Sequence, residues 1–155
     1  MMTGTASVNS LLFFYQLATI FVVALLALYD IRHHKVKNKA LAYFLPWCLL
    51  SLPVSAYATP MPFALLFLRA FLGFLCGGLL LLSASCITHG GIGGGDIKLA
   101  ALLGIIYGAG GICFLLLAAS AAALLFTGLQ MILPGGRKKQ IPFVPFLCAG
   151  LILFL

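Results

Sequence analysis

The feature that most constrains the fold is a succession of long apolar segments without charged side chains. Residues 11–29 carry no charge and would extend roughly 28 Å as a helix, close to the thickness of the hydrocarbon core of a bilayer. Of the 155 residues, 64% are hydrophobic and only 7% are charged, far from the composition of soluble domains. The sequence therefore predicts an all-α, polytopic membrane protein with a single membrane-embedded domain over residues 1–155.

Proline and glycine divide the apolar sequence into six expected transmembrane helices. The helices are expected at residues 11–29, 40–58, 63–87, 96–108, 111–133 and 141–155. Turns are expected at residues 59–62, 108–111 and 134–136, and a glycine-rich connector unable to form a regular helix at residues 89–95. Pro46 and Pro53 are expected to bend the second helix.

Basic residues are concentrated in two segments. Four of the nine Lys and Arg residues lie at positions 32–39 and three at 137–139. With six crossings, both segments fall in loops on the same side, which the positive-inside rule assigns to the cytoplasm. The expected topology therefore has both termini outside, in the cytoplasmic (inner) membrane. The net charge of +7 is attributed to loops that face anionic lipid, so the bilayer, and no nucleic acid, is the expected partner.

The chain contains only two acidic residues, Asp30 and Asp96. Asp30 closes the first apolar segment, and Asp96 ends a glycine run that opens the fourth. The expected topology places both near the cytoplasmic interface. A carboxylate near lipid is costly, which makes this pair the leading candidate site. Two neighbouring carboxylates share a proton, so that one acts as general base on a water and the other as general acid, as in an aspartyl protease.

Each aspartate could instead have a purely structural role. Asp96 could be the N-cap of its helix, and Asp30 could pair locally with His33 or His34. Two other functions also remain open: a small cation- or proton-coupled transporter, and a non-catalytic subunit of a secretion machine. A transport site is expected near the bilayer midplane, so the position of both aspartates at one interface favours the peptidase.

Two motifs resemble those of the type IV prepilin peptidases, a family of membrane aspartyl peptidases. The run GGGDIKL at residues 93–99 matches the family's GxGDxKL motif, and IPFVPF at residues 141–146 is similar to its Pro-Phe-x-Pro-Phe segment. The resemblance covers nearly the whole chain and implies that Asp30 and Asp96 are catalytic. It also implies supporting roles for four residues: Gly93, Gly95, Lys98 and Asn38. The sequence departs from the family at residues 36–38, where Val-Lys-Asn replaces the frequent Ile-Pro-Asn.

The resemblance also implies a substrate and a branch of the family. The expected substrate is a pilin-, pseudopilin- or Flp-type precursor whose short basic leader ends in glycine and precedes an apolar helix, cut at the cytoplasmic face without a cofactor. Larger members carry an N-terminal cytoplasmic segment with paired cysteines, linked to N-methylation of the product. This sequence shows no such segment, and it is therefore expected to be similar to the short, peptidase-only CpaA and TadV proteins of tight-adherence pilus systems.

Other residues carry simpler predictions. The five cysteines are scattered singly, without a CxxC pair, and are expected to be small buried apolar residues. The three histidines, His33, His34 and His89, lack a third-ligand pattern, so no metal is expected.

Three further predictions concern packing and the membrane interfaces. Gly73 to Gly77 and Gly104 to Gly108 have the spacing of close helix packing. Arg69 is expected either to snorkel outward or to contact a buried polar group. Lys98 is expected to anchor the inner interface, on a different helix face from Asp96.

Overall fold

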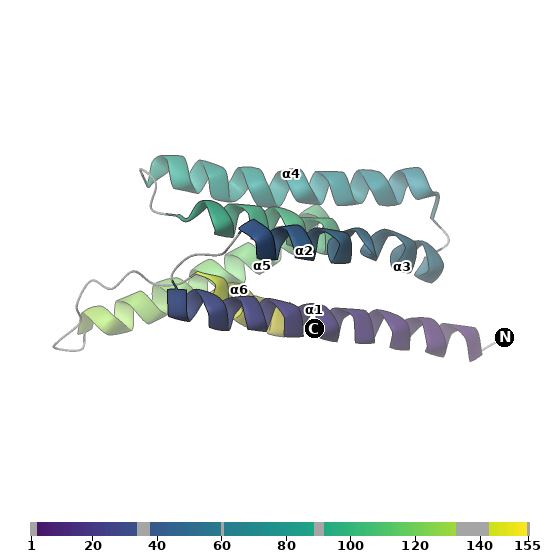
Figure 1. Ribbon diagram of the computed structural model, residues 1–155, viewed down its shortest axis with the longest axis horizontal. Helices are drawn as coiled ribbons and strands as arrows, with labels where there is room; N and C mark the ends of the chain where they lie inside the picture. Colours follow the sequence, from purple (N-terminus) through teal and green to yellow (C-terminus); the bar gives the residue numbers. More distant parts are fainter. Residues whose placement is uncertain (1–2, 34–37, 60, 89–91, 133–142, 155) are drawn as a thin grey trace.

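The computed structural model describes residues 3–33, 38–59, 61–88, 92–132 and 143–154, which form a bundle of helices (Figure 1). The helices are α1 (Thr3–His33), α2 (Asn38–Leu49), α3 (Ser51–Ala58), α4 (Phe63–Ile87), α5 (Gly94–Ile132) and α6 (Val144–Phe154). No strand forms in this part of the chain, which confirms the all-α prediction for these residues.

Several of these helices suit a bilayer by length and composition. Within the described ranges, four segments are long and apolar enough to cross: Ser10–Asp30, Lys39–Ala58, Phe63–Ile87 and Gly94–Leu129. Val144–Leu153 is a shorter apolar helix. Large apolar side chains also point outward; Phe14 is 69% exposed and Leu124 is 73% exposed, as expected where lipid surrounds the protein. The chain is accordingly a multi-pass membrane protein.

The second expected helix is interrupted once. α2 ends at Leu49 and α3 begins at Ser51, but the backbone between them stays helical, with Leu50 at φ −62° and ψ −20°. The N–H of Leu50 donates to the Pro46 carbonyl at 3.0 Å, and the N–H of Val54 donates to the Leu50 carbonyl at 3.3 Å. The helical hydrogen bonds thus continue through Leu50, and the bend expected at Pro46 and Pro53 stays a prediction.

α5 reverses direction at Gly108. This residue has φ 70° and ψ 178°, outside helical geometry and in the region that favours glycine. Both arms, residues 94–107 and 109–132, pack on α4. A Cβ added to Gly77 would lie 2.5 Å from the Ala100 carbonyl oxygen and 3.0 Å from Cγ1 of Ile112. The two ends of α5 accordingly lie towards the same end of the bundle (Figure 1), and the turn predicted at residues 108–111 is confirmed.

The glycine spacings hold α4 against the first arm of α5. A Cβ added to Gly73 would collide with the carbonyl oxygen of Gly104, and one added to Gly104 would collide with that of Gly73. The predicted packing role is therefore confirmed. At the turn, a Cβ on Gly108 would lie 2.9 Å from Nε of Arg69. Arg69 is exposed, so its stem packs on the turn while its charge is not buried in the bundle.

The buried core centres on α5. Its fully buried side chains include Leu99 and Leu103 in the first arm and Ile112 and Leu115 in the second. They pack with Val23 of α1 and with buried residues of α2 and α6. α5 contacts α2, α4 and α6, so it forms the scaffold on which the other helices are arranged.

Polar groups join α1 to α2 inside the bundle. The hydroxyl of Tyr15 donates to the Trp47 carbonyl at 2.8 Å, and Nε1 of Trp47 donates to Oγ1 of Thr19 at 3.1 Å. The rings of Tyr15 and Trp47 stack with centroids 5.3 Å apart. Because an unpaired polar group in hydrocarbon costs free energy, these bonds fix α1 against α2.

The cysteines are all free, and they differ in burial more than was predicted. Cys48 is buried, whereas Cys86 is exposed and the other three are half-buried. The Sγ atoms of Cys76 in α4 and Cys113 in the second arm of α5 lie 3.4 Å apart. The expectation that all five are buried is therefore wrong for Cys86. The reversal at Gly108 also brings two of the thiols together.

Candidate active site

The two aspartates lie at the same end of the bundle. Asp30 is near the C-terminal end of α1 and is only 5% exposed, and Asp96 is half-buried in the first turn of α5. Figure 1 shows that α1 ends and α5 begins towards the same end of the bundle, opposite the N-terminus. The carboxylates lie close enough to interact electrostatically. The fold thus brings together the only two acidic side chains of the sequence.

The backbone around Asp96 differs from the prediction. α5 begins at Gly94, two residues earlier than expected. The Gly93 carbonyl accepts hydrogen bonds from the N–H groups of Asp96 at 3.0 Å and Ile97 at 3.4 Å, and this closes a helical turn around Gly94 and Gly95. Asp96 is therefore inside the first turn and is not the N-cap. A negative charge in this turn is favoured by the helix dipole.

Glycines keep the approach to Asp96 free of side chains. A Cβ added to Gly93 would lie 3.5 Å from Oδ2 of Asp96, and one added to Gly94 would meet nothing within 4 Å. Gly93 and Gly94 are exposed, while Gly95 is half-buried. An extended peptide can therefore pass close to the carboxylate at this point.

Residues 92–93, which lead into α5, are attached to α4 through Ile92. Oγ of Ser85 donates to the Ile92 carbonyl at 3.3 Å, and Ile92 packs against the core. Two turns further along, Ala100 lies under Gly77. α4 therefore supports both the segment that precedes Asp96 and the helix that follows it.

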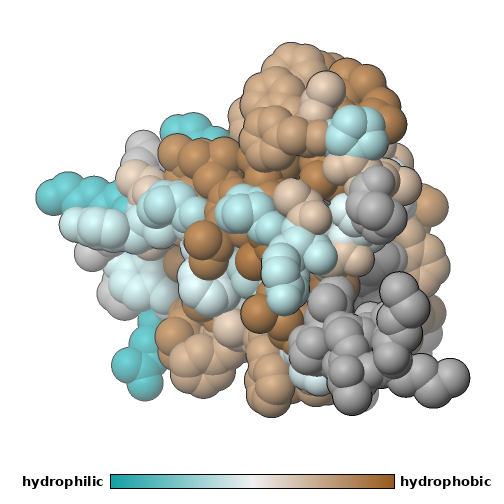
Figure 2. Space-filling model, turned by 90° about the vertical axis from the view of Figure 1, so that its right-hand side faces the viewer, coloured by the Kyte–Doolittle hydropathy of each residue, from teal (hydrophilic) through white to brown (hydrophobic). Residues whose placement is uncertain are grey.

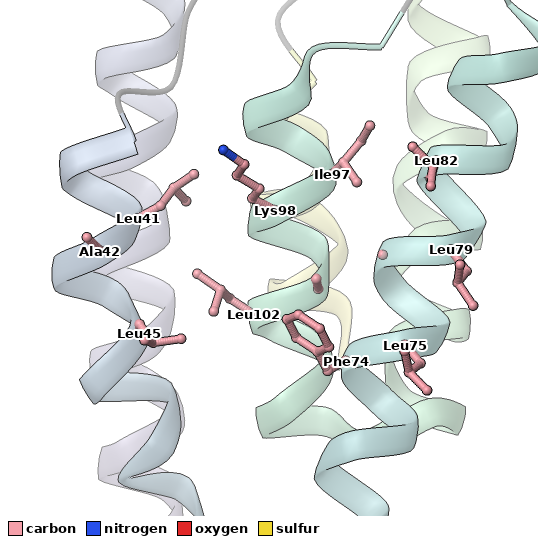
Figure 3. A pocket seen from close by; sticks show the side chains of 12 residues that line it. Leu41, Ala42, Leu45, Phe74, Leu75, Leu79, Leu82, Ile97, Lys98 and Leu102 are labelled. Carbon is pink, nitrogen blue, oxygen red and sulfur yellow. The ribbon is translucent and has the colours of Figure 1, made fainter.

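The other predicted site residues are placed as follows. Lys98 is exposed, and its side chain extends towards α2 (Figure 3). Asn38 is the first residue of α2 and His33 the last of α1, but their side chains are outside the described part of the structure. His34, His89 and the first two residues of the 141–146 motif also lie outside it. Among the described residues, no group of three His, Cys, Asp or Glu side chains is arranged to hold a metal.

The described part of the C-terminal motif packs on the second arm of α5. The ring centroids of Phe146 in α6 and Phe126 in the second arm of α5 are 5.7 Å apart. Val144 is fully buried. These contacts give the motif a packing role between α5 and α6.

A groove beside the first turn of α5 was not predicted. It has a volume of about 480 Å³ and lies between α2 and α4, with the first arm of α5 as its floor (Figure 3). Ile97 and Lys98, the two residues after Asp96, line one end. Helices that are apolar on every side give no sequence signal for such a groove, because no polar face shows how each helix is rotated.

The far end of the bundle is different in character. Figure 2 views the end that holds the N-terminus, where weakly hydrophilic residues lie among apolar ones. A smaller cavity of about 180 Å³ opens there, with Tyr15, Gln16, Ser55 and Arg69 in its lining. It contains no carboxylate, since both acidic side chains are accounted for at the opposite end.

Comparison with known proteins agrees with this arrangement. The type IV leader peptidase family matches residues 17–128, a range that includes both aspartates. The prepilin leader peptidase/N-methyltransferase of Bacillus subtilis (strain 168) is 31% identical over 153 residues, which cover 93% of this chain and 56% of that protein. The chain thus spans about half the length of this curated relative. No solved structure matches the chain. With most of its length matched, the chain belongs to the type IV leader peptidase family.

Proposed function

We propose that this chain is an aspartic endopeptidase that removes the short basic leader from prepilin-like precursors of the pilin, pseudopilin or Flp type. The observation that carries the proposal is the placement of Asp30 and Asp96 at the same end of the bundle, near enough for their charges to interact. Family membership supports the same reading, because the related Bacillus subtilis protein is named as a prepilin leader peptidase. Gly93, Gly95, Lys98 and Asn38 are proposed to support the site.

The proposed mechanism uses the two carboxyl groups as one unit. The ionised carboxylate takes a proton from a water molecule, whose oxygen attacks the carbonyl carbon of the scissile peptide bond. The protonated partner donates to the carbonyl oxygen, which gives a tetrahedral intermediate. Proton transfer to the amide nitrogen then allows the C–N bond to break. Gly93 and Gly94 leave space for the extended leader beside Asp96.

We place the site at the cytoplasmic face of the cytoplasmic (inner) membrane, in a single domain that crosses six times with both termini outside. The basic segments at residues 32–39 and 137–139 support this orientation. The reversal at Gly108 supports the number of crossings, because each arm of α5 then accounts for one. The other four crossings are α1, the pair α2 and α3 taken together, α4 and α6.

A transport function is less well supported. Coupling carboxylates in transporters are expected near the bilayer midplane, where the ion must be held between two gates. Asp30 and Asp96 instead lie at helix ends. This position suits a cut made at the membrane surface.

The test uses the full chain in nanodiscs with a synthetic precursor that contains a basic leader, a glycine and an apolar helix. The proposal expects one cleavage product, cut directly after the glycine, by mass spectrometry. A precursor whose leader glycine is replaced by a bulky residue serves as the control. Absence of any cleavage by protein with a normal helical circular dichroism spectrum would overturn the proposal.

A further inference from the structure

The groove between α2 and α4 is bounded by apolar side chains, and those on the α4 wall are exposed. On α4, Leu75, Leu79 and Leu82 follow helical spacing along one face and are 36%, 57% and 48% exposed. On α2, Leu41 and Leu45 are one turn apart on the opposite wall. The labelled side chains of both walls flank the first arm of α5 in Figure 3. The groove is therefore an open apolar channel on the surface that faces lipid.

Small residues line the groove at three points. Ala42 lies on α2, Gly78 on α4 and Ala101 on the floor. A Cβ added to Gly78 would lie 3.4 Å from that of Ala101, an ordinary contact, so Gly78 is not needed for the packing of α4 on α5. Small residues in a groove let another helix backbone approach closely, which is how helices associate in membranes.

The groove begins beside the first turn of α5, which holds Asp96. Ile97 and Lys98 line it, and they directly follow Asp96. From there it extends along α5 to Ala101 and Leu102, away from the end that holds the aspartates. A helix that lies in the groove would therefore have one end beside the turn that holds Asp96.

We infer that this groove binds the apolar helix that follows the scissile bond of the substrate. The inference rests on the proposed function, which places that helix directly after the cleaved glycine. Because the helix must continue through the bilayer from the site, it needs an apolar surface beside Asp96 that runs along the bundle. The groove provides this surface, and its small residues favour a helix over a disordered lipid chain.

The first test is site-specific photocrosslinking in the Asp96→Asn background, which keeps the precursor intact. A benzophenone side chain is placed at Leu79 or at Leu80. Both leucines are exposed neighbours on α4, at 57% and 44%, but only Leu79 lines the groove. Crosslinks from position 79 to the substrate helix, with none above background from position 80, are expected. Equal crosslinking from both positions, or crosslinking of position 79 to lipid alone, would overturn the inference.

The second test separates this inference from the proposed function. Gly78→Leu fills the groove. The measured quantity is the ratio of kcat/KM for the full precursor to kcat/KM for a short leader peptide without the helix, and the substitution is expected to lower this ratio by about tenfold. Leu80→Trp should leave that ratio unchanged. If the parent protein cleaves both substrates and Gly78→Leu keeps the parent ratio, the groove inference fails alone. If the parent protein cleaves neither substrate, the proposed function fails. Should Gly78→Leu not fold, the crosslinking result decides.

Discussion

Asp30, near the end of α1, interacts electrostatically with Asp96 in the first turn of α5, although the two are far apart in the sequence. The interaction depends on α5, which contacts α2, α4 and α6 and so organises the bundle. The position of α1 is set by its packing on α6 and α3 and by the contacts of Tyr15 with Trp47 of α2. The site is therefore a product of helix packing, which several measurements can test.

The proposed topology predicts which positions face outward. In a variant without native cysteines, Cys placed at Met61 or Gly110 should react with a membrane-impermeant maleimide added from outside, whereas Cys at Thr88 should not. Met61 is 55% exposed, and a Cβ on Gly110 meets nothing within 4 Å, so both variants should fold. Labelling of Thr88→Cys in sealed cells, or protection of Gly110→Cys, would contradict six crossings with both termini outside.

The close approach of α4 and α5 predicts that Gly73→Ala is destabilising. The added methyl group would collide with the Gly104 carbonyl oxygen, and such overpacking typically costs about 1–3 kcal/mol. Reversible unfolding in mixed detergent micelles measures the loss.

Gly78→Ala is the matched control, because its methyl group would be 3.4 Å from Cβ of Ala101. It should be close to neutral. Equal stability of the two variants would show that the two helices are further apart than described.

The reversal of α5 predicts a specific disulfide. In a variant that keeps only Cys76 and Cys113, whose Sγ atoms lie 3.4 Å apart, oxidation with copper phenanthroline should link the two helices. Mass spectrometry of proteolytic fragments identifies the bond. The control keeps Cys86 and Cys113; Cys86 lies roughly 15 Å further along α4 at the helical rise. A crosslink in the control as strong as in the test pair would contradict the fold.

Local signals in the sequence were sufficient to predict several features of the fold. Proline and glycine marked the turn before Phe63 and the reversal at Gly108, because these residues act on their own backbone. The glycine spacing of α4 indicated close packing without a knowledge of the partner helix. In each case the physical cause lies within a few residues of the signal.

Features that depend on the rotation of apolar helices could not be predicted. The contact between Cys76 and Cys113 arises only when α4 and α5 are placed together, and the groove beside Ile97 needs α2 as well. The start of α5 was missed for another reason: glycines usually favour irregular backbone, but the Gly93 carbonyl closes a turn around Gly94 and Gly95. Tertiary support thus overrode a weak local preference.

Lys98→Ala is predicted to retain most of the cleavage activity. The Lys98 side chain extends towards α2 and lines the groove with its alkyl stem (Figure 3), so we assign it no proton transfer. We expect kcat to stay within about tenfold of the parent value. The measurement is cleavage of the synthetic precursor under saturating conditions. A loss as complete as that of an aspartate variant, in folded protein, would show that Lys98 takes part in the chemistry.

The most direct test of the central claim is the cleavage rate of Asp30→Asn, Asp96→Asn and the double variant, with the same precursor in nanodiscs. Asparagine preserves shape but cannot exchange a proton with water or substrate, so each single variant should lose about 10²–10⁴-fold in kcat while it stays folded. Because the carboxyl groups act as one unit, the double variant should be no slower than the slower single variant. Near-parental cleavage by either folded single variant would contradict the aspartyl pair as the catalytic group.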